Sequence, residues 1–357
     1  MKKLLLILLC LPVIGFGQKT YVPDDNFEQE LINLGYDSVL DDSVLTSNIN
    51  TVTFLDISSQ LISNLSGIEG FTALNTLLCN DNMLNSLDVS NNIYLTGLRC
   101  QGMNLTNLDV SNNINLSELV CSNNQLTSLD LSSNTLLNSL VCSNNQLTSL
   151  NLNNNTLLTG LLCQGNQLIT LDFSFNLLLE NLTCTNNQLT SINLNLNTSL
   201  ISLSCAYNNL TSLSLDNNIS LTSLRCSHNQ ISSLNIAQNT LLYDFVCENN
   251  SLTSLDVRNG NNINFVFFKV INNPNLQCIN VDDVTWSTNN WTTNNYSIES
   301  TMYFSSNCIP SFTQEHTTNK ELLKITDLLG RETKELKNQP LLYLYNDGTV
   351  EKRIVIE

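Results

Sequence analysis

A cysteine returns every 21 residues through the middle of the chain. It is found at Cys79, Cys100, Cys121, Cys142, Cys163, Cys184, Cys205, Cys226 and Cys247. Two adjacent copies, CSNNQLTSLDLSSNTLLNSLV at 121–141 and CSNNQLTSLNLNNNTLLTGLL at 142–162, are nearly identical. A unit this short cannot bury its apolar face alone and must stack on its neighbours. The period therefore predicts a solenoid of stacked turns and not a single globular core.

Each copy contains the same pattern twice, an apolar pair followed by asparagine. In one copy these residues are Leu119, Cys121 and Asn124 in the first half and Leu129, Leu131 and Asn134 in the second. Apolar residues at period two predict a short strand in each half. The asparagine that follows is expected to turn inward and bond the backbone of the bend. Both asparagines recur along the array, with Met103 as a departure in the first half, so they indicate two structural ladders.

These residues resemble the leucine-rich repeats, in the nested 21-residue class that carries Cys in place of the third Leu. The resemblance covers residues 52–270, where 52–78 form one earlier turn with Ile57 at the cysteine position. It implies a repeat solenoid, mainly β, of about ten turns. Because the end turns of such an array must be covered, we expect an N-terminal helical cap at 18–51 and a C-terminal cap at 271–310.

The N-terminal segment combines an export signal with a helix. Residues 1–17 have two lysines before an apolar run, which predicts a secretory signal peptide. Cleavage of this peptide would remove Cys10. Residues 22–35 predict the helix of the cap, with a start at Pro23 and Asp24, one apolar face and an end at Gly35; the apolar face holds Phe27, Leu31 and Leu34. A calcium site at Asp24 and Asp25 is the alternative, but it lacks the spaced oxygen ligands of calcium loops.

The repeated cysteines allow three alternatives in an exported protein: free thiols, disulfides or a metal site. Stacked turns place equivalent cysteines about 4.8 Å apart, whereas disulfide Cβ atoms lie ~3.8 Å apart. A metal would have to bind a single row, with only His228 and His316 as further ligands. We expect free, buried thiols in the ladder and no metal or other cofactor. Cys278 and Cys308 stand outside the period and are left to form a disulfide with each other.

Charge and residue content argue against nucleic acid and catalysis. The net charge is −17, and between Cys79 and Asp256 two basic residues, Arg99 and Arg225, face eleven acidic ones. Phosphate binding needs a basic surface. Two histidines without a supporting motif do not assemble a catalytic set. Acidic residues recur at one repeat position, which favours a structural role over a catalytic one. They are Asp88, Asp109, Asp130, Asp172 and Asp256. We therefore predict no enzyme.

The last 38 residues differ from the array. Residues 311–319 are expected to be a linker, and 320–357 hold alternating strand residues around a turn at Asn346 and Gly348. The segment resembles the C-terminal sorting domain read by the type IX secretion machinery of Bacteroidetes, in ITDLLGRE and in its final strand, although the Pro-Asn-Pro opening is absent. The resemblance implies export through the periplasm to the cell surface or medium. A hairpin that only seals the solenoid is the alternative.

One face of the array is more varied than the rest. The residues before each cysteine point outward and include apolar and basic side chains, whereas the outward row of the second half is nearly all Asp and Asn. We predict that a protein or glycan ligand contacts this first-strand face, at Arg99, Val120, Val141, Leu162, Tyr207, Arg225 and His228. Val and Leu that merely stack as good strand formers are the structural alternative. The functional alternative is a passive surface-layer or spacer protein.

Overall fold

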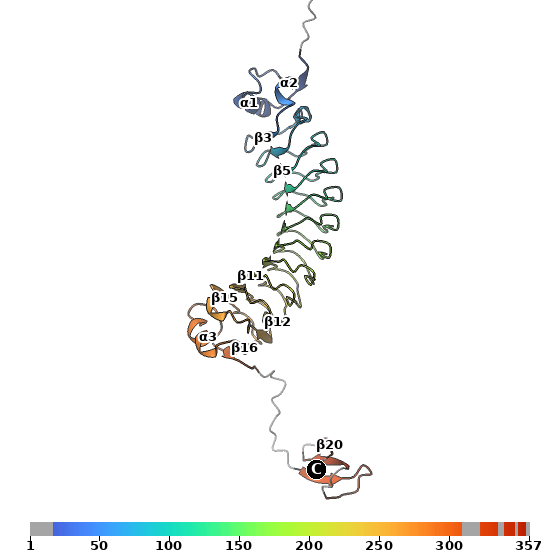
Figure 1. Ribbon diagram of the computed structural model, residues 1–357, viewed down its shortest axis with the longest axis vertical. Helices are drawn as coiled ribbons and strands as arrows, with labels where there is room; N and C mark the ends of the chain where they lie inside the picture. Colours follow the sequence, from blue (N-terminus) through green and yellow to red (C-terminus); the bar gives the residue numbers. More distant parts are fainter. Residues whose placement is uncertain (1–16, 309–321, 335–338, 347–348, 355–357) are drawn as a thin grey trace, which may run out of the picture. The chain divides into compact units, whose positions relative to one another are not determined.

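The computed structural model describes residues 17–308, 322–334, 339–346 and 349–354 (Figure 1). The chain divides into two compact units, Met1–Asn307 and Cys308–Glu357. The predicted signal peptide up to residue 16 and the predicted linker lie outside the described residues.

One strand from each turn joins a parallel sheet of eleven strands along the first unit. In order they are β3 (Phe54–Asp56), β4 (Thr76–Leu78), β5 (Gly97–Arg99), β6 (Glu118–Val120), β7 (Ser139–Val141), β8 (Gly160–Leu162), β9 (Asn181–Thr183), β10 (Ser202–Ser204), β11 (Ser223–Arg225), β13 (Asp244–Val246) and β15 (Phe267–Lys269). This confirms the mainly β repeat solenoid. The sheet includes a turn beyond the last repeated cysteine, where Val270 is buried in the cysteine's place.

The interior of the solenoid is a continuous column of leucine and cysteine. The nine repeated cysteines are all free and fully buried. Ile57 fills the same position in the earlier turn and is also fully buried. The thiols therefore act as small apolar side chains that let adjacent turns approach closely.

Burial is expected to protect these thiols from reagents. Removal from water raises the pKa of Cys142 and Cys184 to about 12, and only the thiolate reacts readily. The folded protein should resist alkylation near pH 8, while the denatured, unreduced protein should titrate nine thiols in a colorimetric thiol assay. Cys278 and Cys308 are disulfide-bonded, and their pairing with each other stays a prediction. Four or more disulfides under these conditions would contradict the ladder.

The first-half asparagines hold successive turns together. Asn145 Nδ2 donates to Cys121 O of the preceding turn at 3.0 Å and to Cys142 O of its own turn at 3.1 Å. Its Oδ1 accepts from the Leu126 N–H at 3.0 Å. Asn124 and Asn166 repeat these contacts one turn away on either side. Each amide thus satisfies buried backbone groups that the tight bend leaves without partners.

The second half of the turn differs from the prediction. Strands form there only toward the C-terminal end, as β12 (Ser233–Asn235), β14 (Ser254–Asp256), β16 (Cys278–Asn280) and β17 (Tyr303–Ser305). In earlier turns the described backbone shows only an isolated bridge between Asp88 and Asp109. There side-chain amides bond backbone carbonyls of the preceding turn: Asn134 Nδ2 donates to Val110 O at 3.0 Å and to Asn113 O at 2.9 Å. The prediction of a strand in every second half was therefore wrong.

The segment predicted as the N-terminal cap contains β1 (Lys19–Tyr21), α1 (Asp25–Asn33), β2 (Ser43–Leu45) and α2 (Thr46–Ile49), with β1 and β2 antiparallel. Phe27 and Leu31 are buried as predicted. Leu34 lies beyond the helix end and is 41% exposed, so its predicted place in the core was wrong. Instead the helix buries Glu28, whose carboxylate accepts the N–H groups of residues 41 to 43 at 2.9 to 3.0 Å. This buried acid fastens the following loop to the helix.

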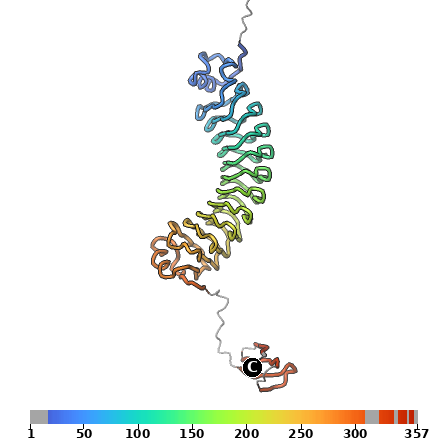
Figure 2. The backbone as a smooth tube through the Cα atoms, viewed as in Figure 1, coloured from blue at the N-terminus to red at the C-terminus, as the bar shows by residue number. Residues whose placement is uncertain are grey.

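Short helices and aromatic rings complete the rest of the first unit. Two 3-10 turns, η1 (Ile68–Gly70) and η2 (Asn262–Asn264), lie near its ends, and α3 (Val284–Asn290) lies between β16 and β17. Trp291 stacks on Phe268 with ring centroids 3.8 Å apart, which covers the end of the apolar column. Figure 2 shows the turns stacked one on the next from the N-terminal cap to this end.

The second unit is a three-stranded antiparallel sheet. Its strands are β18 (Leu322–Thr326), β19 (Pro340–Tyr345) and β20 (Val350–Ile354), in that order. Leu341, Tyr343 and Tyr345 form a core cluster separate from that of the solenoid. In neither unit does a described helix have the length and apolar content to cross a membrane.

Candidate functional site

The exposed face of the main sheet carries a row of side chains from consecutive turns. Along the sheet the middle residue of each strand is buried and the third faces solvent. The row formed by the third residues is Asp56, Leu78, Arg99, Val120, Val141, Leu162, Thr183, Ser204, Arg225, Val246 and Lys269. We call it the sheet-face row. Its first half is largely apolar and its second half polar.

Four of the predicted contact residues are neighbours in this row. Arg99 lies opposite Val120, Val120 opposite Val141, and Val141 opposite Leu162. The three apolar side chains are half-buried because each packs between its neighbours. Arg225 lies in the same row, with β9 and β10 between it and Leu162. The predicted surface is therefore continuous only from Arg99 to Leu162.

Tyr207 and His228 lie outside the sheet, in the turns after β10 and β11. Their rings stack with centroids 4.0 Å apart and planes 11° apart. Both residues adopt the left-handed backbone conformation, with φ of 54°. The equivalent positions in most other turns hold Asn, Asp or Gly, which tolerate this conformation better. Strain of this kind costs about 1 to 3 kcal/mol per residue and concentrates at functional sites.

The two cations of the middle turns both lie on the sheet face and are both paired. Arg99 Nη2 lies 2.7 Å from Glu118 Oε1. Arg225 Nη2 lies 3.0 Å from Asp244 Oδ2, which also accepts from Ser223 Oγ at 2.9 Å. Asp244, in the second pair, is buried. The Arg99 and Glu118 side chains are both exposed, and exposed pairs of this kind add about 0 to 1 kcal/mol to stability. The position of this exposed pair on the outer face is therefore of more interest for recognition than for folding.

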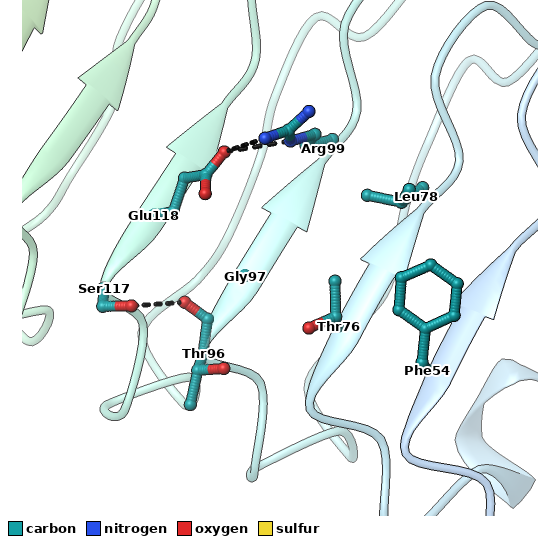
Figure 3. A pocket seen from close by; sticks show the side chains of 8 residues that line it. All are labelled: Phe54, Thr76, Leu78, Thr96, Gly97, Arg99, Ser117 and Glu118. Carbon is teal, nitrogen blue, oxygen red and sulfur yellow. Dashed lines mark hydrogen bonds and ion pairs between the residues drawn. The ribbon is translucent and has the colours of Figure 1, made fainter.

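A hollow of about 330 Å³ opens on this face over the first turns (Figure 3). Its lining residues come from β3 to β6 and the loops before them: Phe54, Thr76, Leu78, Thr96, Gly97, Arg99, Ser117 and Glu118. Phe54 and Leu78 stand on one side, and the Arg99 and Glu118 pair stands on the other. Of these residues the sequence predicts only Arg99 as part of the site. The available signal was Gly97, a glycine at the start of a strand.

The acidic row of the second half has a local structural role. Asp88, Asp109, Asp130 and Asp172 each accept the backbone N–H of the serine two residues later, at 2.9 Å. Hydrogen bonds from these serines lower the pKa of all four carboxyl groups. The row is uniform because each turn needs the same acceptor.

The N-terminal carboxylates are likewise committed to the fold. Asp24 accepts the N–H groups of Phe27, Ser63 and others; burial would raise its pKa, but these hydrogen bonds, led by Ser63, hold it below its ordinary value. Within the described residues one trio, Glu28, Asp37 and Asp41, has carboxylate oxygens within 4.8 Å of one another. Lys19 Nζ already lies 2.8 Å from Asp41. These groups anchor a loop and cap a helix.

Comparison with solved structures decides the architecture. An internalin of Listeria monocytogenes, InlF, superposes with a TM-score of 0.57 at 24% identity, covering 73% of this chain and 84% of that one. The solenoid has the leucine-rich repeat fold. The leucine-rich repeat ectodomain of the Arabidopsis thaliana receptor kinase GASSHO1/SCHENGEN3 gives a TM-score of 0.58 at 20% identity, over 66% of this chain and 34% of that one.

Sequence comparison gives a shorter match. Internalin J of Listeria monocytogenes is 34% identical over 72 residues, which is 20% of this chain and only 8% of Internalin J. No protein-family model matches the chain. The leucine-rich repeat fold is therefore established from the structure and its period.

Proposed function

We propose that this leucine-rich repeat protein binds a partner protein through its sheet face, outside the cell, in an adhesive or other recognition role. The proposal rests on the apolar, half-exposed part of the sheet-face row. It consists of Leu78, Val120, Val141 and Leu162, with Arg99, which pairs with Glu118, between Leu78 and Val120. Apolar side chains flanked by charged groups are typical of protein interfaces, and solenoids present such extended faces to partners. The Arabidopsis ectodomain, which has this fold, was solved in complex with CASPARIAN STRIP INTEGRITY FACTOR 2.

The passive spacer remains the second candidate, and the polar second half of the sheet-face row favours it. Thr183 and Ser204 would serve a spacer as well as a ligand. The strained aromatic pair Tyr207 and His228 weighs against it, because asparagine at both positions would fold with less strain. A glycan ligand on the same face would be a further outcome of a binding screen.

We propose export by the type IX secretion machinery, which would recognise residues 320–357. The support is the separate small β unit with its own apolar cluster and the resemblance of its sequence to sorting domains. An extracellular or cell-surface location would follow.

Replacing the apolar row tests the proposed function. The mature protein is screened against immobilised matrix proteins, bacterial surface proteins and a glycan panel. For a panel member that binds, changing Val120, Val141 and Leu162 together to Asp should weaken binding at least about 100-fold, because three apolar contacts are lost and three charges are desolvated. The measurement is surface plasmon resonance, with the melting temperature as a check on folding.

The matched control changes three other apolar residues of nearby turns to Asp. Ile114, Leu136 and Leu157 are 56%, 47% and 42% exposed and lie in loops before the strands. This variant should bind as the original protein does. The reverse result, with the loop variant inactive and the row variant active, would place the interface elsewhere. A screen in which nothing binds would support the spacer.

A further inference from the structure

Two strands of the sheet start with glycine although the fold does not require it. Gly97 begins β5 and Gly160 begins β8, both at the same register position. Neither has a positive φ. A Cβ at Gly97 would meet its nearest atom, Thr76 Cγ2, at 3.6 Å, and a Cβ at Gly160 would meet nothing within 4 Å. Glycine weakens a strand, and it often marks a place where another molecule approaches closely.

The surroundings of the two glycines differ. Gly97 lies between Thr76 and Glu118 in the register, with Phe54 one strand further. The missing side chain leaves an open floor between Thr76 and the Arg99 and Glu118 pair, and the exposed Phe54 ring stands beyond Thr76 (Figure 3). Gly160 lies between Ser139 and Asn181, with Leu162 and Val141 further along its own and the neighbouring strand. Of the two gaps, the one at Gly97 combines an exposed aromatic ring, an open floor and a charged rim.

At the rim of the hollow, one carboxylate oxygen of Glu118 is available to accept a hydrogen bond. Arg99 Nε and Nη2 both bond to Glu118 Oε1, at 2.9 and 2.7 Å. Within the described residues Glu118 Oε2 receives no hydrogen bond, and the Glu118 side chain is 38% exposed. The Phe54 ring, 54% exposed, stands across from it. A ligand that fits both walls therefore has an apolar side chain next to a hydrogen-bond donor.

We propose that the hollow around Gly97 receives one large apolar side chain, preferably aromatic, from a basic segment of a partner protein. About 330 Å³ is at the lower limit of small-molecule pockets, so it suits a single side chain. The chain's net charge is −17, and a field of that sign attracts basic partners. A lysine beside the inserted ring would reach Glu118. This inference rests on the proposed sheet-face function and specifies the chemistry of its partner.

Capped tripeptides are the probes that test this inference on the full mature chain. Acetyl-Lys-Phe-Lys-amide should bind with a dissociation constant of about 1 to 10 mM, seen as saturation transfer to its ring protons in NMR. Acetyl-Lys-Ala-Lys-amide should bind at least about tenfold more weakly because it buries no ring. Acetyl-Glu-Phe-Glu-amide should also bind at least about tenfold more weakly because its charge is reversed. Equal binding of the Phe and Ala probes, or no transfer to the first probe, would overturn the proposal.

Filling the gap provides the matched variants. Gly97→Leu should reduce binding of acetyl-Lys-Phe-Lys-amide at least about tenfold, whereas Gly160→Leu, the same change at the same strand position, should leave it unchanged. Both variants have room for a Cβ and should melt no lower than the original protein. If Gly97→Leu binds the probe normally, the hollow is not the site. A partner that is lost with the Val120, Val141 and Leu162 triple variant but kept by Gly97→Leu would separate the two proposals.

Discussion

Replacing Asn145 by alanine is expected to lower the free energy of unfolding by about 3 to 5 kcal/mol. The Leu126 N–H donates to Asn145 Oδ1, and an orphaned buried donor costs about 1 to 3 kcal/mol. Cys121 O and Cys142 O each lose one bond but keep another, from Asn124 and Asn166. The cost is large because one amide serves two turns.

Matched variants separate the hydrogen bonds from the volume that the side chain fills. Asn145→Asp keeps the shape but points a carboxylate oxygen at three carbonyl groups, so it should be at least as destabilising as alanine. Asn153→Ala, at an exposed position nearby, should change stability by less than about 0.5 kcal/mol. If Asn145→Asp were neutral, packing and not hydrogen bonding would hold the ladder.

The chain contains its own natural counterpart of this experiment. Met103 stands at the ladder position of one turn and is 5% exposed, and it has no amide to accept from the Leu84 N–H. Met103→Asn should therefore raise the free energy of unfolding, by about 1 kcal/mol. Urea titrations followed by circular dichroism measure all four variants. Because repeat arrays can unfold in parts, coincident transitions by fluorescence are needed before the values are compared.

The repeat made most of the fold predictable from sequence. Cysteine at period 21 sets the turn length, and Leu119, Cys121 and Asn124 impose one geometry that every neighbour must copy. The second half of each repeat has the same pattern of apolar residues and asparagine, but in most turns the described residues form no strand there. Leu131 and Asn134 satisfy the local pattern equally well with side-chain amides on the carbonyls, and a period-two pattern does not distinguish these two outcomes.

The candidate site was only partly predictable, because it depends on contacts between turns. Val120, Val141 and Leu162 share one repeat position, so their row followed from the period. Phe54 and Glu118 line opposite sides of the hollow, but they come from turns far apart in sequence and are different residue types. The left-handed backbone conformation at Tyr207 was also not predicted from the sequence. Asparagine and glycine at the equivalent position of other turns indicate that conformation.

Removing residues 320–357 is expected to abolish export while leaving the solenoid folded. The deleted segment holds its own apolar cluster of Leu341, Tyr343 and Tyr345, which is distinct from the solenoid's cluster. Its loss should therefore leave the melting temperature of the solenoid within a few degrees. In a host that carries type IX machinery, the truncated protein should accumulate in the periplasm, measured by fractionation and immunoblotting.

A point variant makes this test independent of chain length. Tyr343 is 4% exposed in the centre of the small sheet, so Tyr343→Asp should unfold that unit by burying a charge and should block export as the deletion does. Lys352→Gln, exposed on β20, is the control and should be exported normally. Normal export of both the deletion and Tyr343→Asp would refute the sorting role. Loss of solenoid folding in the deletion would instead identify the segment as a seal for the array, because only a seal contributes to the solenoid's own stability.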